Sequence, residues 1–256
     1  MFLLLSGEGP SDIGCSIVEA VEICKGEHFL PGPMAWFVDQ LVEQFVDQLQ
    51  GFEMSHIEYG QVGFVSEKSL SQHCKQASGG RKIRLPGKKT GQETSYFFRN
   101  ARGLGELAHR LADEVQDSVI AVLFRDSDRT ASSNRGLRRK KVESMENGFK
   151  AARFDYGVPM MPNPKSEAWL LCAVKSQSPY QHCDALEEMS GNDKGLNPLK
   201  EQLEAAMGGY PSSDKLSDLV KDRSIDVLQI DMPSLREFRE ALSEAVSRLL
   251  RPARDT

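Results

Sequence analysis

Two apolar runs without polar alternation stand out in the chain. Residues 1–5 (MFLLL) stop at the polar stretch SGEGPSD, and residues 119–124 (VIAVLF) stop at RDSD. A strand that is apolar at successive positions is covered on both faces, which is typical of parallel sheets in α/β proteins. The pattern therefore predicts two buried parallel strands, and shorter apolar runs predict two more at 57–65 and 157–161.

Segments with apolar residues at helical spacing alternate with these strands. Helices are predicted at 34–49, 92–115, 141–154, 166–174 and 234–250. Residues 66–92 are polar, glycine-rich and basic, and we expect a long exposed loop there with one helical turn near Leu70. The alternation predicts an α/β fold, with a mostly parallel sheet and helices on both faces.

The last third of the chain has a helical pattern without further strands. We therefore expect a core domain over 1–175, carrying the basic insertion at 66–92. A helical C-terminal extension over 176–256 is expected to pack on that core.

Acidic residues follow the two strongest strand predictions. Glu8 follows the first strand between two glycines, with Asp12 one helical turn later, and Asp126 and Asp128 follow the other strand. Because sites in parallel α/β sheets form beyond the carboxyl ends of the strands, we expect these residues to meet. Mg²⁺ prefers such hard oxygen ligands. Two other interpretations stay open, namely a capped turn at 8–12 and solvated acids in an Asx-turn at 126–128.

Glu167 begins the helix that follows the strand at 157–161, so we expect it at the same sheet edge. A catalytic role and a simple interaction with the helix dipole are both consistent with this position. Lys165 is a candidate phosphate contact, with an ordinary exposed lysine as the alternative.

The order of these motifs resembles the Toprim domain of topoisomerases, primases and OLD-family nucleases. A hydrophobic strand followed by Glu-Gly matches at Glu8, and a later strand followed by Asp-x-Asp matches at Asp126 and Asp128. Asp12 matches the OLD-type variant, which adds acids for a second metal. The segments SEAWLL and PSLREF, at 166–171 and 233–238, look like a less characterised Toprim-like family linked to phage defence.

This resemblance implies a Toprim-like, Rossmann-like fold and a Mg²⁺- or Mn²⁺-dependent endonuclease that hydrolyses DNA or RNA. The metal would be held by Glu8, Asp12, Asp126 and Asp128, and the catalytic residues would be Glu8, Asp126, Asp128 and Glu167. The resemblance also implies an effector of a prokaryotic anti-phage system. Any ATP-driven step would need a separate ATPase partner, since the chain has no G-x-x-x-x-G-K-[ST] loop.

The net charge of −5 does not by itself indicate a nucleic-acid-binding protein, so such a partner would need a local basic patch. One basic run lies inside 66–92 and another directly follows Asp-x-Asp. Together with Lys165, the candidate nucleic-acid contacts are Arg81, Lys82, Arg84, Lys88, Lys89, Arg135, Arg138, Arg139, Lys140 and Lys141. The alternative for each run is a solvated surface.

Two rival functions remain open. Residues 126–130 (DSDRT) also fit the Asp-x-Asp-x-Thr motif of haloacid-dehalogenase-like phosphatases, in which Asp126 would be the nucleophile and Asp128 the acid/base. That interpretation leaves Glu8 without a role. The second rival is a Toprim scaffold or sensor subunit that has lost catalysis and acts through partners.

Five cysteines, at positions 15, 24, 74, 172 and 183, form no C-x-x-C pair, and we expect free thiols in a reducing compartment. The N-terminal apolar run is too short for a signal peptide, and no apolar stretch reaches the length of a membrane span. These features predict a cytoplasmic protein without membrane contact.

Overall fold

The computed structural model describes residues 1–19, 21–77, 90–128 and 136–250. Its five-stranded sheet has the order β3-β5-β1-β6-β7. The parallel strands are β1 (Phe2–Gly7), β5 (Val62–Ser66), β6 (Val119–Phe124) and β7 (Gly157–Met160). The short β3 (Cys24–Lys25) pairs antiparallel with β5 at one edge. The predicted α/β fold with a mostly parallel sheet is confirmed.

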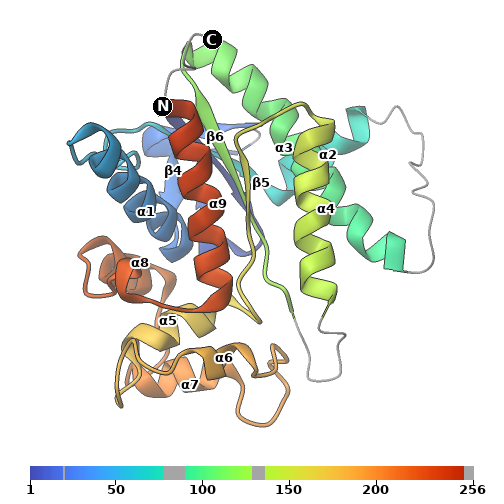
Figure 1. The fold of residues 1–256 in the computed structure, drawn as a ribbon. Helices are drawn as coiled ribbons and strands as arrows, with labels where there is room; N and C mark the ends of the chain where they lie inside the picture. The colour runs from blue at the N-terminus through green and yellow to red at the C-terminus, as the bar shows by residue number, and fades with distance from the viewer. Residues whose placement is uncertain (20, 78–89, 129–135, 251–256) are drawn as a thin grey trace.

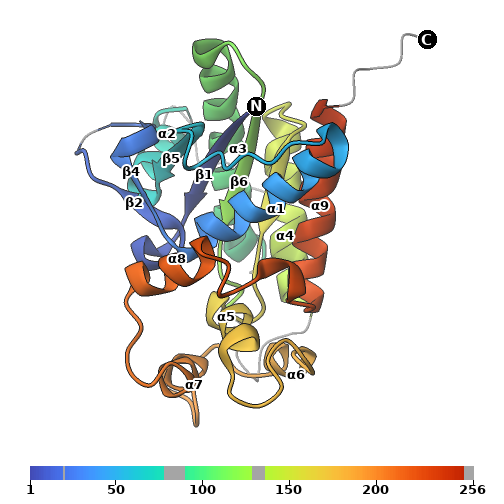
Figure 2. The same ribbon diagram turned by 90° about the vertical axis from the view of Figure 1, so that its left-hand side faces the viewer.

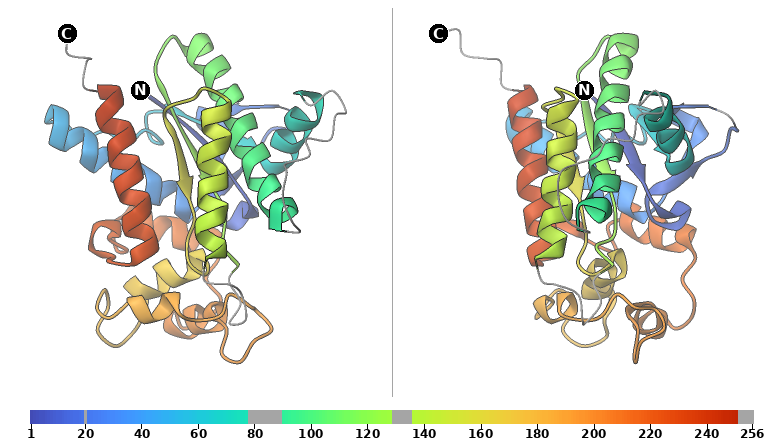
Figure 3. Two further views of the ribbon diagram at one scale, coloured as in Figure 1. Left: turned by 45° about the vertical axis from the view of Figure 1, so that its right-hand side comes forward. Right: turned by 90° about the vertical axis from the view of Figure 1, so that its right-hand side faces the viewer.

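Helices cover both faces of the sheet (Figure 1). One face carries α1 (Pro33–Gln50), α8 (Ser213–Lys221) and α9 (Pro233–Leu250). The other carries α2 (Glu67–Ala77), α3 (Thr90–Val115) and α4 (Leu137–Ala151), and Figure 3 shows α3 and α4 side by side. Leu3 and Leu5 enter the first hydrophobic core, whereas Leu4 between them enters the second. Because both faces are covered, the central strands need apolar residues at every position.

A third group of helices lies beyond the carboxyl ends of the strands (Figures 1 and 2). It consists of α5 (Ser166–Val174), α6 (Asp184–Glu187) and α7 (Leu199–Ala206). In the described part of the chain, no helix is both long and apolar enough to cross a membrane.

The segment between β1 and α1 forms small irregular elements. A π-helix, η1 (Gly9–Ile13), leads into a two-stranded antiparallel sheet of β2 (Gly14–Ser16) and β4 (Phe29–Pro31). A single 3-10 turn, η2 (Gly26–His28), precedes β4, and another, η3 (Val227–Gln229), precedes α9. These elements place the residues after β1 at the carboxyl edge of the main sheet.

The strand expected at 57–65 begins only at Val62, so the prediction is wrong for residues 57–61. The chain turns there because a buried acid of α1 holds it. The Asp39 carboxylate accepts hydrogen bonds from the Ser55 hydroxyl at 2.6 Å and from the His56 backbone N–H at 2.7 Å. Because the residue that holds this turn lies 16 or more positions earlier in the chain, the turn could not be predicted from its own sequence.

The loop expected over 66–92 contains more helix than one turn, because α2 occupies Glu67–Ala77. Ser66 caps this helix by accepting the Ser69 backbone N–H at 3.1 Å. Leu70 is fully buried and belongs to the core between α2 and α3. The buried leucine and the serine cap therefore both help to hold this mostly polar helix.

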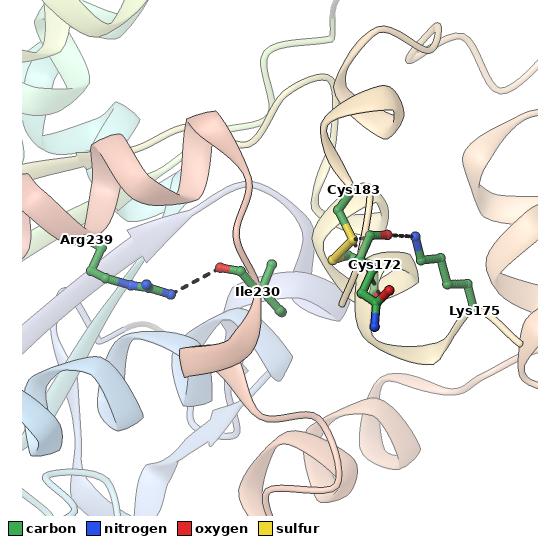
Figure 4. The surroundings of a disulfide bond; sticks show 6 residues. Cys172, Lys175, Cys183, Ile230 and Arg239 are labelled. Carbon is green, nitrogen blue, oxygen red and sulfur yellow. Dashed lines mark hydrogen bonds between the residues drawn. A yellow bond between two sulfur atoms is a disulfide. The ribbon is translucent and has the colours of Figure 1, made fainter. Parts of the chain in front are cut away.

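A disulfide joins Cys172 near the end of α5 to Cys183 just before α6 (Figure 4). Both residues are buried. The expectation that these two cysteines are free thiols is therefore wrong. The sequence separation of 11 residues gave no local motif from which the pairing could be predicted.

Thiol titration of the unfolded protein tests this pairing. Before reduction it should detect three of the five thiols, those of Cys15, Cys24 and Cys74, and after reduction all five. A double Cys172→Ser, Cys183→Ser variant should give three under both conditions. Five thiols without reductant would contradict the disulfide.

Candidate functional site

The two central strands end side by side at the carboxyl edge of the sheet. In the register of β1 and β6, Gly7 lies opposite Phe124, so Glu8 and Arg125 are the first residues beyond the strands. The chain passes from β1 to β5 on one side and then crosses to β6 on the other. The connections therefore diverge between β1 and β6, which is where open α/β sheets form binding crevices.

Glu8 and Asp126 are in direct contact at this point. The backbone N–H of Asp126 donates to Glu8 Oε1 at 2.7 Å, across 118 residues of sequence. The Asp126 side chain turns toward α5, where its Oδ1 accepts the Ser166 backbone N–H at 3.0 Å. The sequence expectation that Glu8 and Asp126 lie together is thus met in the structure.

Asp12 joins the same group through Ser166. The Ser166 hydroxyl donates to Asp12 Oδ1 at 2.6 Å, so this serine bridges Asp12 and Asp126. The turn that brings Asp12 back depends on Gly9, whose φ is +75°. A Cβ at Gly9 would lie 2.6 Å from Asp12 Oδ2, so a larger residue would meet both strain and a clash.

The acids of this group repel one another in a poorly solvated place. Burial raises the pKa of Glu8, Asp12, Asp126 and Glu167. The pKa of Asp126 is raised well above its ordinary value, first by burial and then by the negative charges of Asp12, Glu167 and Glu8. Glu167 therefore lies within electrostatic reach of the others. Four carboxyl groups from three chain segments form the acidic cluster: Glu8, Asp12, Asp126 and Glu167.

Asp128 lies at the rim of the acidic cluster, with its side chain 62% exposed. Its backbone has a left-handed conformation, with φ +49°, and its N–H donates to the Pro164 carbonyl at 3.1 Å. The Lys165 ammonium lies 4.0 Å from Asp128 Oδ1 and 2.9 Å from Asp193 Oδ1. These acids raise the pKa of Lys165 against the opposing effect of its burial, so it remains a cation beside the cluster.

Glu67 is a neighbour of the acidic cluster that the sequence analysis missed. It is the first residue of α2, directly after β5, whose last residue Ser66 lies opposite Gly7 of β1. Its charge acts on Glu8, raising the pKa of that group, and its carboxylate accepts the Tyr96 hydroxyl. The available signal was an acidic residue directly after a predicted strand, as at Glu8 and Asp126. It was overlooked because residues 66–92 were interpreted as a loop.

Arg125 is the buried cation of the site, with only 1% of its surface exposed. Its Nη1 donates to the Phe124 carbonyl at 2.9 Å, and its guanidinium carbon lies 5.5 Å from the Tyr96 ring centroid. Its charge lowers the pKa of Glu8, partly offsetting the larger effect of burial. Within the described residues, Nε and Nη2 of Arg125 have no hydrogen-bond partner.

The basic residues after Asp-x-Asp divide into two kinds. Arg138 donates to the Met161 carbonyl and to Glu237, and the Lys141 ammonium donates to the Ser127 carbonyl at 2.9 Å. Arg139 and Lys140 face solvent, with Arg139 paired to Glu143. The first two therefore hold the loop and helix in place, and the other two remain available to a ligand. Arg81, Lys82, Arg84, Lys88, Lys89 and Arg135 lie outside the described residues.

Two cavities border the site. The larger, about 830 Å³, lies between the loop around Glu8 and α2, and its lining includes Gly7, Gly9 and Glu67. The smaller, about 90 Å³, is lined by Asp12, Glu167, Lys200 and Tyr210 among others. The smaller cavity thus reaches Asp12 and Glu167 of the acidic cluster, whereas the larger is lined by the glycines on either side of Glu8.

The acidic cluster has the donor chemistry of a divalent-metal site but not a closed set of ligands. Carboxylate oxygens suit Mg²⁺ and Mn²⁺, and a cation would relieve their mutual repulsion. Over the described ranges, no three aspartate, glutamate, histidine or cysteine side chains are arranged to hold one ion together. Ser166 occupies the position between Asp12 and Asp126. An ion would have to draw these side chains together.

Comparison of the chain with protein-family models, curated proteins and solved structures finds no match.

Replacing Asp126 with Asn should stabilise the protein in the absence of metal. Asn keeps an oxygen to accept the Ser166 N–H but removes one of the repelling charges. We expect the free energy of unfolding, measured by urea denaturation in EDTA at neutral pH, to rise by about 1–3 kcal/mol. The control is Asp113→Asn, at an exposed position near the end of α3 at the opposite edge of the sheet.

The gain from Asp126→Asn should depend on pH. Because the pKa of Asp126 is raised in the folded state, its carboxyl favours folding at low pH and loses that contribution as pH rises through the folded-state pKa. The gain should therefore be small at about pH 4 and larger at about pH 8. A loss of stability at every pH would contradict the electrostatic account.

Proposed function

We propose that the chain is a divalent-metal-dependent nuclease of the Toprim type, hydrolysing phosphodiester bonds of DNA or RNA. The observation that carries this proposal is the contact between Asp126 and Glu8, with Asp12 and Glu167 close by. Acids from segments this far apart in the chain meet where β1 and β6 end. Raised carboxyl pKa values in a crevice are typical of functional sites.

The order of the strands supports the finer, Toprim-like assignment. The glutamate follows the first strand of the parallel set, and Asp-x-Asp follows its immediate neighbour β6. The haloacid-dehalogenase-like alternative gives Glu8 no task, although its carboxylate contacts the backbone of the would-be nucleophile. We therefore prefer the nuclease.

Glu8, Asp12, Asp126 and Asp128 would hold Mg²⁺ or Mn²⁺ in the proposed enzyme. The ion would stabilise charge on the phosphate oxygens and lower the pKa of the attacking water. The chain's own groups orient the site. Ser166 holds Asp12 and Asp126 in position, and the protonated Lys165 offers a positive charge to a substrate phosphate. Glu167 would accept a proton from water at the cluster.

A role in anti-phage defence, with a separate ATPase as partner, is part of the same proposal. It rests on the resemblance of 166–171 and 233–238 to Toprim-like proteins linked to defence, and on the lack of a phosphate-binding P-loop motif in this sequence.

A catalytically silent scaffold is the second candidate. The observation that favours it is that, across the residues described, no set of three ligands is ready to hold an ion. A scaffold of this kind would retain the fold and the acidic cluster but show neither metal-dependent cleavage nor a change in stability with Mn²⁺.

Purified protein incubated with plasmid, single-stranded DNA or RNA separates these functions. With Mg²⁺ or Mn²⁺ we expect cleavage that EDTA abolishes. Asp126→Asn and Glu8→Gln should each reduce the rate by roughly a hundredfold or more, because each removes a charge needed at the phosphate. Asp113→Asn should cleave like the wild type.

Release of inorganic phosphate from small phosphomonoesters, with a trapped aspartyl-phosphate at Asp126, would favour the phosphatase instead. Full activity of Asp126→Asn would contradict a role for the cluster in any cleavage that is seen.

A further inference from the structure

Tyr210 is a large aromatic side chain left open to solvent beside the acidic cluster. It is 69% exposed, and it lines the cavity of about 90 Å³ that also contains Asp12 and Glu167. Leu170 and Leu203 add apolar surface to the same cavity. Exposed aromatic rings beside a positive charge provide the stacking surfaces on which single-strand-binding proteins hold unpaired bases.

The position of Tyr210 is fixed by the turn that precedes it and the helix that follows. Gly208 and Gly209, with φ of +71° and +147°, reverse the chain after α7 in conformations that L side chains rarely adopt. Ser212 then caps α8 by accepting the Lys215 N–H. The hydroxyl of Ser213 donates to the Ser11 carbonyl at 2.8 Å. The start of α8, which closely follows Tyr210, is therefore anchored to the loop that carries Asp12.

Lys200 adds a positive charge to the same surface. Its ammonium lies 5.4 Å from the centroid of the Tyr210 ring, a cation–π contact that leaves most of the ring exposed. It also lies close enough to Asp12 to lower the pKa of that carboxyl, against the larger effect of burial. Lys200 is thus close to both the aromatic ring and Asp12, and it lines the same cavity as they do.

An aromatic face next to an ammonium matches the chemistry of one nucleotide. A base stacks on the ring, and its phosphate meets the cation. Bases within a duplex are paired and stacked on each other, so only an unpaired, unstacked base can stack on the ring. We propose that Lys200 and Tyr210 form a subsite for an unpaired nucleotide next to the scissile phosphate, so that the substrate is single-stranded. This inference rests on the proposed nuclease function and specifies its substrate.

Binding of a fluorescein-labelled oligothymidylate to the full chain tests the subsite. Affinity is measured by fluorescence anisotropy at low salt, with Ca²⁺ replacing Mg²⁺ to slow cleavage, and compared with that for the blunt duplex. We expect Tyr210→Ala to weaken single-strand binding roughly tenfold, the effect of losing one stacked base. Tyr210→Phe keeps the ring and should stay within about twofold of the wild type.

Tyr59→Ala is the matched control, because Tyr59 is 72% exposed and precedes β5 at the opposite edge of the sheet. It should leave the affinity unchanged. Lys200→Met should weaken binding and reduce its salt dependence, since it removes a phosphate contact.

Three results would overturn the subsite. The first is equal single-strand affinity of Tyr210→Ala and the wild type, and the second is a loss of affinity in Tyr210→Phe as large as that in Tyr210→Ala. The third is a higher affinity of the wild type for the duplex than for the single strand. Cleavage assays separate this failure from that of the nuclease. If Tyr210→Ala loses affinity but the wild type does not cleave with Mg²⁺ or Mn²⁺, Lys200 and Tyr210 still form a single-strand-binding subsite, and the nuclease proposal fails. Cleavage that needs Asp126 but has the same KM in Tyr210→Ala overturns the subsite alone.

Discussion

Repulsion between carboxylates packed at the end of two central strands is the constraint on which the rest of this structure depends. Asp126 donates its backbone N–H to Glu8, and the negative charges of Asp12 and Glu167 act on its buried carboxyl group. Burying acids beside one another is unfavourable unless they are protonated, hydrogen-bonded or paired with a cation. The surrounding structure supplies hydrogen bonds from Ser166 and the charge of the buried Arg125. These interactions compensate the burial and repulsion of the acids only in part, because the pKa of each stays raised, and this supports the proposed binding of a cation.

The topology explains why these particular segments meet. Because β1 and β6 are neighbours whose connections leave in opposite directions, the residues after each strand face a common crevice. The strand β7 then leads to α5, whose first residues close that crevice from beyond the strand ends. The apolar strands are rigid and covered on both faces, so they place the polar residues at their ends with little freedom. The hydrophobic cores thus determine the geometry of the acidic cluster.

Much of this arrangement could be predicted from the sequence, and what could not has physical causes. The strand at 119–124 and the helix at 166–174 are reproduced at the same residues, because continuous burial imposes an unambiguous apolar pattern. The contact of Glu8 with Asp126 followed from the rule for strand ends. The hydrogen bonds of Asp39 and the Cys172–Cys183 disulfide join separate segments of the chain, so no local sequence pattern predicted either interaction. Glu67 was missed because the start of α2 was interpreted as part of a loop, and Arg125 was missed because the sequence does not show how deeply a charge is buried.

The most direct test is to soak crystals of the protein in Mn²⁺ and measure anomalous scattering at the manganese absorption edge. The account predicts an anomalous peak enclosed by the carboxylates of Glu8, Asp12, Asp126 and Asp128, with the Ser166 hydroxyl displaced from Asp12. A well-diffracting soaked crystal with no peak there, and with Asp12 and Asp126 still bridged by Ser166, would contradict it.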